Sequence, residues 1–279
     1  MDTGQTSFTA SCLQVNAGNS LEQNIATAVD MIGVAVDEGS NIVFMPENVT
    51  MMEWGRKAIA AKAEIEKDHP GLIAFKNAAK KHGVWLHCGS LSILLDDGRI
   101  ANRTYVLDSD GNIAAQYDKI HMFDVDLGEG ERYAESSTFA PGDRAVLVDL
   151  PWCKLGLTIC YDLRFPGLFR DLAQAGAELI AVPSAFTQLT GEAHWHVLLR
   201  ARAIETGAYV VAPAQTGIHP GGRGTYGHAL IVDPWGSVIA DAGADVGLIR
   251  ETIDVQKVER TRQKMPSLSH DRAFVALST

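Results

Sequence analysis

Short apolar runs alternate with amphipathic stretches along the whole chain, and this alternation limits the folds that the chain can adopt. Apolar runs of this length are typical of buried strands, whereas the stretches between them have the spacing of helices that cover one face of a sheet. The order strand, helix, strand, helix and then a pair of hairpin strands occurs twice. We therefore expect an α/β fold with two mixed sheets face to face and helices outside, an α-β-β-α sandwich.

Start and stop signals place the expected elements and the domain. Helices are predicted at residues 20–38, 68–82, 166–175 and 192–206. Strands are predicted at residues 8–15, 41–45, 84–95, 103–107, 113–117, 155–160, 179–183, 209–214, 226–233 and 248–253. The chain of 279 residues is expected to form one domain, residues 1–279. From residue 255 onward the sequence is charged and loses its periodicity, so residues 255–279 are predicted to be a C-terminal arm or tail.

The net charge and the spacing of the cysteines limit which partners and which cellular compartment we expect. The formal net charge is −10 at pH 7, so the average field repels nucleic acid, and no basic stretch offsets it. No apolar run is long enough to cross a bilayer, and the N-terminus lacks a secretory pattern, so no membrane contact is expected. Cys12, Cys88, Cys153 and Cys160 lie far apart, which favours reduced thiols in a cytoplasmic protein over disulfides or a zinc site.

Two further features suggest metal or phosphate binding at first sight, but neither has the required context. His194 and His196 are two positions apart on a predicted helix, so their side chains point to nearly opposite faces and cannot share an ion. The glycine-rich segment 219–224 lacks the strand and helix that flank a phosphate loop. We expect no cofactor and no metal, and we expect segment 219–224 to border the mouth of a site.

Cys160 lies at the end of the predicted strand 155–160, directly before a turn into a helix. Ligands of open α/β sheets bind at this edge, and the positive end of a following helix favours a thiolate there. A free cysteine in a strand is more commonly a small buried hydrophobe. Position alone leaves both explanations open.

Glu47 and Lys119 follow predicted strands in the same way. A carboxylate beside a core is poised to act as a base, and a lysine at a strand end can stabilise an oxyanion. Each also fits an ordinary solvated loop residue. Spacing does not show whether the two converge on Cys160.

Five segments together resemble the nitrilase, or carbon–nitrogen hydrolase, superfamily over nearly the whole chain. They are residues 44–47 (FMPE), 117–121 (YDKIH), 156–166 (GLTICYDLRFP), 183–186 (PSAF) and 200–205 (RARAIE). The resemblance implies a cysteine-dependent amidase that works through a thioester, with Glu47 as general base, Lys119 stabilising the oxyanion and Cys160 as nucleophile.

The same resemblance implies further site residues. The backbone N–H of Tyr161 would contribute to the oxyanion site, and Glu135 would orient the lysine or the substrate. Arg164, close behind the nucleophile, fits either a substrate carboxylate or a salt bridge that holds the turn. The candidate substrate contacts are Arg164, Phe186, Thr187, His194 and Arg223.

Within the superfamily, segments 190–195, 197–202, 226–228 and 233–236 are most similar to the Nit branch and its deaminated-glutathione amidases. This implies hydrolysis of a small-molecule amide, deaminated glutathione, to 2-oxoglutarate and cysteinylglycine. The alternatives are an ω-amidase acting on 2-oxoglutaramate, an N-carbamoyl amide hydrolase, and a catalytically silent scaffold of the same fold. The resemblance also implies a homodimer or higher homo-oligomer that stacks as α-β-β-α-α-β-β-α.

Overall fold

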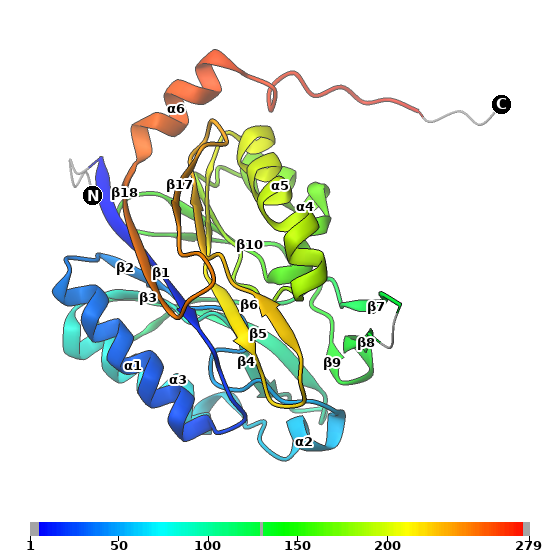
Figure 1. Ribbon diagram of the computed structural model, residues 1–279. Helices are drawn as coiled ribbons and strands as arrows, with labels where there is room; N and C mark the ends of the chain where they lie inside the picture. The colour runs from blue at the N-terminus through cyan, green and yellow to red at the C-terminus, as the bar shows by residue number, and fades with distance from the viewer. Residues whose placement is uncertain (1–5, 129–130, 276–279) are drawn as a thin grey trace.

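The computed structural model describes residues 6–128 and 131–275. Two mixed sheets pack face to face, and helices cover the outer face of each, so the predicted α-β-β-α sandwich is confirmed (Figure 1). A small third sheet, β7 (Asp124–Asp126) with β8 (Arg132–Ala134), lies at the rim.

The first sheet has ten strands among the described residues, and its central strand is β1. It pairs in parallel with β2 and β14 and antiparallel with β18, so the end of the chain lies along its beginning. The strands are β1 (Ser7–Val15), β2 (Ile42–Phe44), β3 (Trp85–His87), β4 (Leu91–Leu94), β5 (Ile100–Leu107), β6 (Ile113–Asp118), β9 (Phe139–Ala140), β14 (Ala214–Ile218), β15 (Gly224–Tyr226) and β18 (Gly247–Asp254).

The second sheet has six strands in the part of the chain that the structure describes. Its parallel centre, β11, β12 and β13, is flanked by antiparallel strands on both sides. In spatial order the strands are β10 (Val146–Asp149), β11 (Lys154–Leu157), β12 (Leu179–Ala181), β13 (Tyr209–Ala212), β16 (Leu230–Val232) and β17 (Val238–Asp241).

Helices cover the two outer faces. The helices α1 (Leu21–Asp37) and α3 (Pro70–His82) pack on the first sheet, and α4 (Pro166–Gln174) and α5 (Gln188–Thr206) pack on the second. Strand alternation sets which side chains reach which layer, since successive residues point to opposite faces. In β1, Phe8, Ala10 and Cys12 join the core between the sheets, whereas Leu13 and Val15 join the core under α1 and α3.

Helix ends follow the signals in the sequence. Ser20 caps α1, and Gly83 ends α3 in the left-handed conformation, as predicted. The helix α5 starts one turn earlier than predicted because Thr187 accepts a hydrogen bond from the Thr190 N–H and caps it there. The described residues also form shorter helices, among them α2 (Arg56–Ala60) and the 3₁₀ turns η1 (Glu66–Asp68) and η2 (Glu135–Ser137).

The prediction of one long strand at 84–95 was wrong. The chain forms β3 and β4 instead, because Gly89 between them has a φ of 62° and its backbone lies against the carbonyl of Pro46. A Cβ at this position would be 2.0 Å from that carbonyl oxygen. The break therefore brings the segment that carries Glu47 close to β4.

Two other predicted strands are each divided between the sheets. The predicted strand 209–214 contains β13 of the second sheet and the first residue of β14 in the first sheet. The predicted strand 226–233 contains the last residue of β15 in the first sheet and all of β16 in the second. Because β14, β15 and β18 all join the first sheet, the two halves of the sequence do not form one sheet each. The second change of sheet occurs at Gly227 and His228, both with positive φ.

The C-terminal segment is more ordered than the aperiodic sequence indicated. It begins with the helix α6 (Val255–Lys264), capped by Asp254, in which Val258 is buried and Arg262 donates to the carbonyl of Ala177. This helix was not predicted because it is charged and has only two buried positions, so its apolar residues do not show a clear helical period. Beyond α6 the chain is extended across one end of the molecule (Figure 1), and the last four residues of the predicted arm, 276–279, lie outside the described part.

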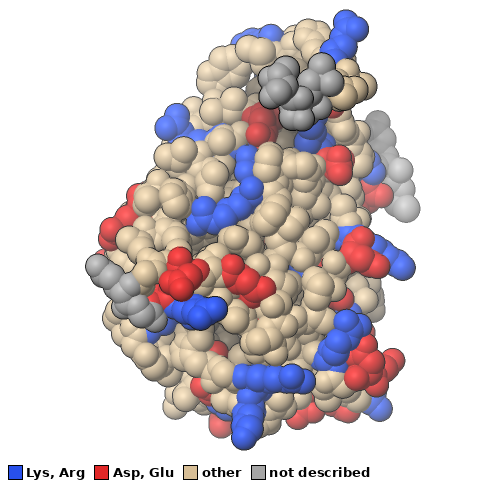
Figure 2. Space-filling view, turned by 90° about the vertical axis from the view of Figure 1, so that its right-hand side faces the viewer, with Lys and Arg blue, Asp and Glu red and all other residues tan. Residues whose placement is uncertain are grey.

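Acidic and basic side chains are interspersed among uncharged ones on the side of the molecule at the right of Figure 1 (Figure 2). Among the described helices, none is both long enough and apolar enough to cross a membrane.

Candidate active site

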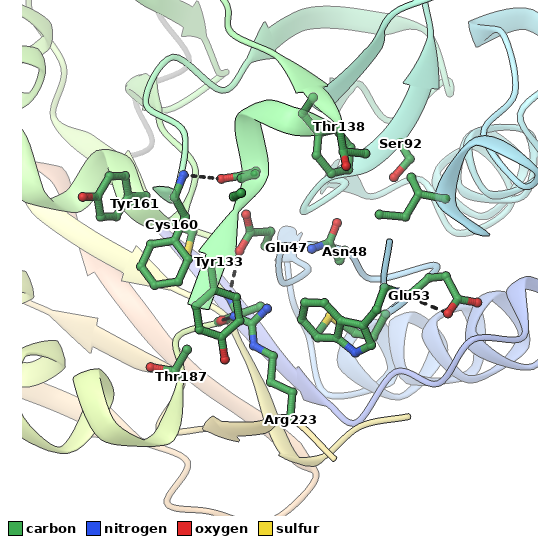
Figure 3. Close-up of a pocket in the computed structure, with 18 of the residues that line it drawn as sticks. Glu47, Asn48, Glu53, Ser92, Tyr133, Thr138, Cys160, Tyr161, Thr187 and Arg223 are labelled. Carbon is green, nitrogen blue, oxygen red and sulfur yellow. Dashed lines mark hydrogen bonds between the residues drawn. The ribbon is translucent and has the colours of Figure 1, made fainter. Parts of the chain in front are cut away.

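A cavity of about 300 Å³ opens at the ends of the central strands. Glu47, Lys119, Glu135 and Cys160, which come from four separate segments, all line it. Figure 3 shows Glu47 and Cys160 beside one another, with Tyr133 and Arg223 on the adjoining wall. The fold therefore brings Glu47 and Lys119 together with Cys160, which their spacing along the sequence did not show.

Glu47 follows β2 and Pro46, and its side chain is 3% exposed. Its Oε2 accepts the backbone N–H of Ala185 at 3.0 Å, and its Oε1 accepts from Lys119 at 2.8 Å and from Asn102 at 3.0 Å. Three donors from three segments hold the carboxylate in one orientation. A buried carboxylate with this many partners keeps its charge and its direction.

Lys119 directly follows β6, and its backbone N–H donates to the carbonyl of Asn102 on β5. Its side chain is 2% exposed, and its Nζ lies 2.8 Å from Glu47 and 2.9 Å from each oxygen of Glu135. Glu135 also accepts from the Phe123 N–H at 2.7 Å. The ammonium is thus fixed between two carboxylates at the floor of the cavity.

Cys160 opens the 3₁₀ turn η3 (Cys160–Arg164) instead of ending a strand as predicted, because β11 stops at Leu157. Its φ is 48°, a conformation that non-glycine residues rarely adopt and that tends to occur at functional sites. The turn is held by the buried Asp162, which accepts from the Ile159 N–H at 2.8 Å and from the Tyr117 hydroxyl at 2.7 Å. Asp162 also accepts the His121 N–H, and so ties the cysteine turn to the segment that carries Lys119.

The charge states of these groups follow from burial and from one another. Burial raises the pKa of Glu47, but the Lys119 ammonium and hydrogen bonds from Lys119 and the Cys160 thiol hold it below its ordinary 4.5. Burial opposes the charge of Lys119, yet Glu135 and Glu47 raise its pKa well above 10.5. Burial and the charge of Glu47 raise the pKa of Cys160 more than Lys119 lowers it. The site holds a carboxylate, an ammonium and a neutral thiol.

This result reverses the expectation of a thiolate stabilised by a helix end. The segment after Cys160 is a five-residue 3₁₀ turn, and the thiol is 7% exposed beside a carboxylate. Burial and a like charge both penalise ionisation here. Attack by this cysteine requires that its proton pass to a base as the new bond forms, and Glu47 is hydrogen-bonded to it.

The predicted substrate contacts fall into two groups. Phe186, Thr187 and Arg223 line the cavity. Arg164 and His194 do not, and they contact each other instead, with Arg164 Nη1 3.3 Å from His194 Nδ1. Arg164 also lies over the ring of Phe186, 5.4 Å from its centroid. The described contacts of Arg164 show neither a place in the cavity lining nor the expected salt bridge, because its printed partners are His194 and the rings of Tyr161 and Phe186.

Arg223 lies on the cavity wall between two aromatic rings. Its guanidinium carbon is 4.9 Å from the centroid of Trp54 and 5.0 Å from that of Tyr133. Its Nη2 donates to the carbonyl of Ala185, whereas its buried Nε has no hydrogen-bond partner among the described residues. A cation fixed in this way with a donor to spare is suited to bind an anionic group.

Two residues that organise the site were not among the candidates named from the sequence. Asn102 donates to Glu47 at 3.0 Å and to Glu135 at 3.2 Å, and Asp162 makes the four contacts that hold the cysteine turn. Each is a polar residue in a largely apolar context, which is unusual for a buried position. That context marks them as candidates, but only the fold identifies their partners.

Comparison with known proteins shows the family to which this chain belongs. Residues 9–263 match the family model described as carbon-nitrogen hydrolase. A deaminated glutathione amidase of Yersinia enterocolitica is 40% identical over 268 residues, which cover 95% of this chain and 93% of that protein. The chain therefore belongs to the carbon–nitrogen hydrolase family, and it is a hydrolase of carbon–nitrogen bonds other than peptide bonds.

Solved structures show the same relationship. The NitFhit protein of Caenorhabditis elegans is 37% identical with a TM-score of 0.89, and the match covers 96% of this chain and 66% of that longer one. Nit3 of Saccharomyces cerevisiae, a member of branch 10 of the nitrilase superfamily, is 27% identical with a TM-score of 0.85, and the match covers 94% of this chain and 95% of Nit3.

Proposed function

We propose that this chain is an amidase that hydrolyses deaminated glutathione to 2-oxoglutarate and cysteinylglycine, with Cys160 as nucleophile, Glu47 as general base and Lys119 as oxyanion stabiliser. The observation that carries the proposal is the contact of Glu47 with both Lys119 and the Cys160 thiol at the floor of the cavity. The substrate is inferred from relatives that bear the name deaminated glutathione amidase.

In the first half of the reaction, Glu47 takes the thiol proton as the sulfur of Cys160 attacks the amide carbon. Lys119 and the backbone N–H of Tyr161 stabilise the oxyanion, and Glu135 holds the lysine in place. The proton on Glu47 then passes to the leaving nitrogen. The C–N bond breaks, the amine leaves, and a thioester to Cys160 remains.

In the second half, water enters the place that the amine has left. Glu47, ionised again, takes a proton from this water as its oxygen attacks the thioester carbon. The same oxyanion donors act again, and the C–S bond breaks. The acid product leaves, and the thiolate regains its proton from Glu47. The proton that returns to Cys160 comes from the attacking water and replaces the one that left with the amine, so the proton balance closes.

Arg223 supports an acidic substrate. Deaminated glutathione carries carboxylates at both ends, and Arg223 has a free buried N–H on the wall of the cavity. Arg56 and Arg132 also line the cavity and are exposed, so they would be reached by the end of a longer substrate. Three guanidinium groups around one cavity favour an anionic amide over a neutral one.

The nucleophile is tested by Cys160→Ala. We expect turnover to fall by at least about 10⁴-fold, since removal of a covalent nucleophile leaves only binding and oxyanion stabilisation. Cys153→Ala is the matched control, because it removes another buried thiol far from the cavity lining. Circular dichroism establishes whether both variants fold. Activity of a folded Cys160→Ala above trace level would exclude this nucleophile.

The substrate is tested by a panel of deaminated glutathione, 2-oxoglutaramate, N-carbamoyl amines and simple nitriles. We expect the highest kcat/KM for deaminated glutathione. A higher value for 2-oxoglutaramate would make the chain an ω-amidase, and turnover of carbamoyl amines alone would assign that class instead. No turnover of any member, with an unreactive Cys160, would favour the silent scaffold.

We also propose that residues 1–279 form one domain with residues 255–279 as its C-terminal arm, and that two chains pair as a homodimer. The arm returns to α4, where Asp271 accepts from Arg170 at 2.9 Å and from Gln174 at 3.2 Å. On the same side of the sandwich, α5 exposes Val197 and Ile204, which are 66% and 52% exposed. Uncovered apolar side chains beside an arm support pairing through this face.

A further inference from the structure

His196, His228 and Asp241 form a cluster outside the proposed active site. His196 lies on α5, His228 lies between β15 and β16, and Asp241 ends β17. One donor atom from each residue lies within 4.8 Å of the others. The cavity lining includes none of the three, so the amidase proposal does not explain them.

We propose that His196, His228 and Asp241 form a binding site for a divalent transition metal ion of the zinc type. Two imidazoles and one carboxylate are a donor set that binds zinc, whereas calcium and magnesium favour oxygen donors alone. The ligand atoms are Nε2 of His196, Nδ1 of His228 and Oδ2 of Asp241. The fourth position faces solvent, since the three side chains are 33%, 25% and 33% exposed.

The spacing of the donor atoms fits a tetrahedral ion. Bonds of about 2.0–2.1 Å in this geometry separate neighbouring ligand atoms by roughly 3.3 Å. Oδ2 of Asp241 lies 3.1 Å from His196 Nε2 and 3.2 Å from His228 Nδ1. The two nitrogens are at most 4.8 Å apart, and a rotation of the partly exposed His196 ring closes that gap.

The surroundings hold two of the ligands in place. The His228 ring stacks on Tyr226, with centroids 4.4 Å apart, and its backbone carbonyl accepts from Trp195 at 2.7 Å. Its φ of 54° is a costly conformation for histidine, and such strain persists where the surroundings enforce it. Asp241 accepts from the Gly243 N–H at 2.8 Å through Oδ1, which leaves Oδ2 for the ion. Oriented ligands of this kind lose little freedom when a metal binds.

The charge of the cluster also favours a cation. Asp241 contributes a carboxylate that lies within hydrogen-bond distance of both imidazoles. The sequence did not reveal this set because His196 and Asp241 are 45 residues apart along the chain.

An ion here would join α5 to the hairpin of β16 and β17. The effect would reach the cavity through Trp195, which bonds the His228 carbonyl and packs on Phe186 with ring centroids 4.8 Å apart. Phe186 lines the cavity. The metal is therefore placed to stiffen one wall without touching the reacting atoms.

The test is calorimetric titration of Zn²⁺ into chelator-treated, full-length Cys160→Ala, in which the cavity thiol cannot compete for the ion. We expect one Zn²⁺ per chain and a rise in the melting temperature on binding. Adding His196→Ala should weaken binding by about 100-fold or more, since even an outer contact of a metal site costs 10–100-fold. Asp241→Asn, which keeps the shape, should weaken it as well.

His194→Ala is the matched control, because it removes a histidine from the same helix two positions away, and it should bind Zn²⁺ as the parent does. The proposal is overturned if the parent binds no Zn²⁺, or if His196→Ala binds as tightly as His194→Ala. None of these readouts depends on turnover, so the outcome is independent of the proposed amidase function.

Discussion

At the scale of single residues, the site keeps two opposite charges and one neutral thiol together in a buried position. Glu47 and Lys119 stabilise each other's charged forms, and Glu47 holds Cys160 protonated. The proton that must leave the sulfur is therefore already directed at its acceptor. Burial and the charge of Glu47 together keep the thiol neutral at rest, and Glu47 is also the group that we propose activates it.

Glu47→Gln separates these two roles. The thiol pKa is expected to fall, because the charge of Glu47 is, after burial, the largest influence that raises it, and Lys119 remains. Turnover is nevertheless expected to fall about 10²–10⁴-fold, since the general base is lost. The thiolate of Cys160 is measured by ultraviolet absorbance as the difference between each protein and its Cys160→Ala counterpart.

In the unsubstituted chain that difference should show less than half ionisation at pH 9.0, the ordinary thiol pKa. Because the pKa of Cys160 is raised in the folded protein, the protonated thiol persists as the pH rises through the ordinary thiol pKa. A thiolate already formed at neutral pH, or a Glu47→Gln variant that keeps full turnover, would contradict the assignment of Glu47.

The sequence was sufficient to name the proposed reacting groups because the family segments contain those residues themselves. It did not identify Asn102 or Asp162, whose roles depend on pairs such as Asn102 with Glu135 and Asp162 with Tyr117 that are far apart along the chain. It also gave the wrong charge for Cys160, because a thiol pKa depends on burial and on neighbours that spacing does not specify.

At the scale of secondary-structure elements, the alternation of strands and helices predicted the layers correctly. The helix boundaries also agreed at Ser20 and Gly83, where a side chain or a glycine caps the end, but not at Thr187, whose cap starts α5 one turn earlier than predicted. The errors lie where a continuous apolar run changes direction or sheet, because both segments are buried and hydrophobicity does not distinguish them. Gly89 and Gly227 mark two such places, and both have positive φ in the structure.

Gly89→Ala tests the close approach that positions Glu47. The added Cβ would meet the Pro46 oxygen at 2.0 Å and the Met45 oxygen at 2.7 Å, so the segment before Glu47 must move. We expect a loss of roughly 2–4 kcal/mol in the free energy of unfolding, from left-handed strain together with overpacking, and a lower kcat. Urea unfolding and steady-state kinetics measure the two effects.

Gly83→Ala is the control for backbone strain alone. Its φ of 63° nearly equals the 62° of Gly89, but nothing lies within 4 Å of its added Cβ. It should cost about 1–2 kcal/mol and leave kcat unchanged. Equal losses of stability and activity in the two variants would show that the contact with Pro46 does not position Glu47.

At the scale of the whole molecule, one chain leaves its C-terminal arm poorly covered. Phe274 and Val275 are 89% and 82% exposed, and the ion pair of Asp271 with Arg170 is too exposed to hold the arm firmly by itself. The helix α6, by contrast, is packed through Val258 and Arg262. A truncated chain made to test the arm should therefore lack residues 266–279 and keep α6, so that the truncation does not disturb the fold.

The proposed pairing through α5 makes a prediction about mass in solution. Light scattering after gel filtration should give 60.2 kDa, twice the 30.1 kDa of one chain. Val197→Glu places a charge on the exposed face of α5 and should give 30.1 kDa, because a buried unpaired carboxylate opposes association. Val34→Glu, at a 50% exposed position of α1 on the opposite layer, should remain at the dimer mass. A Val197→Glu chain that still pairs would place the interface on another face.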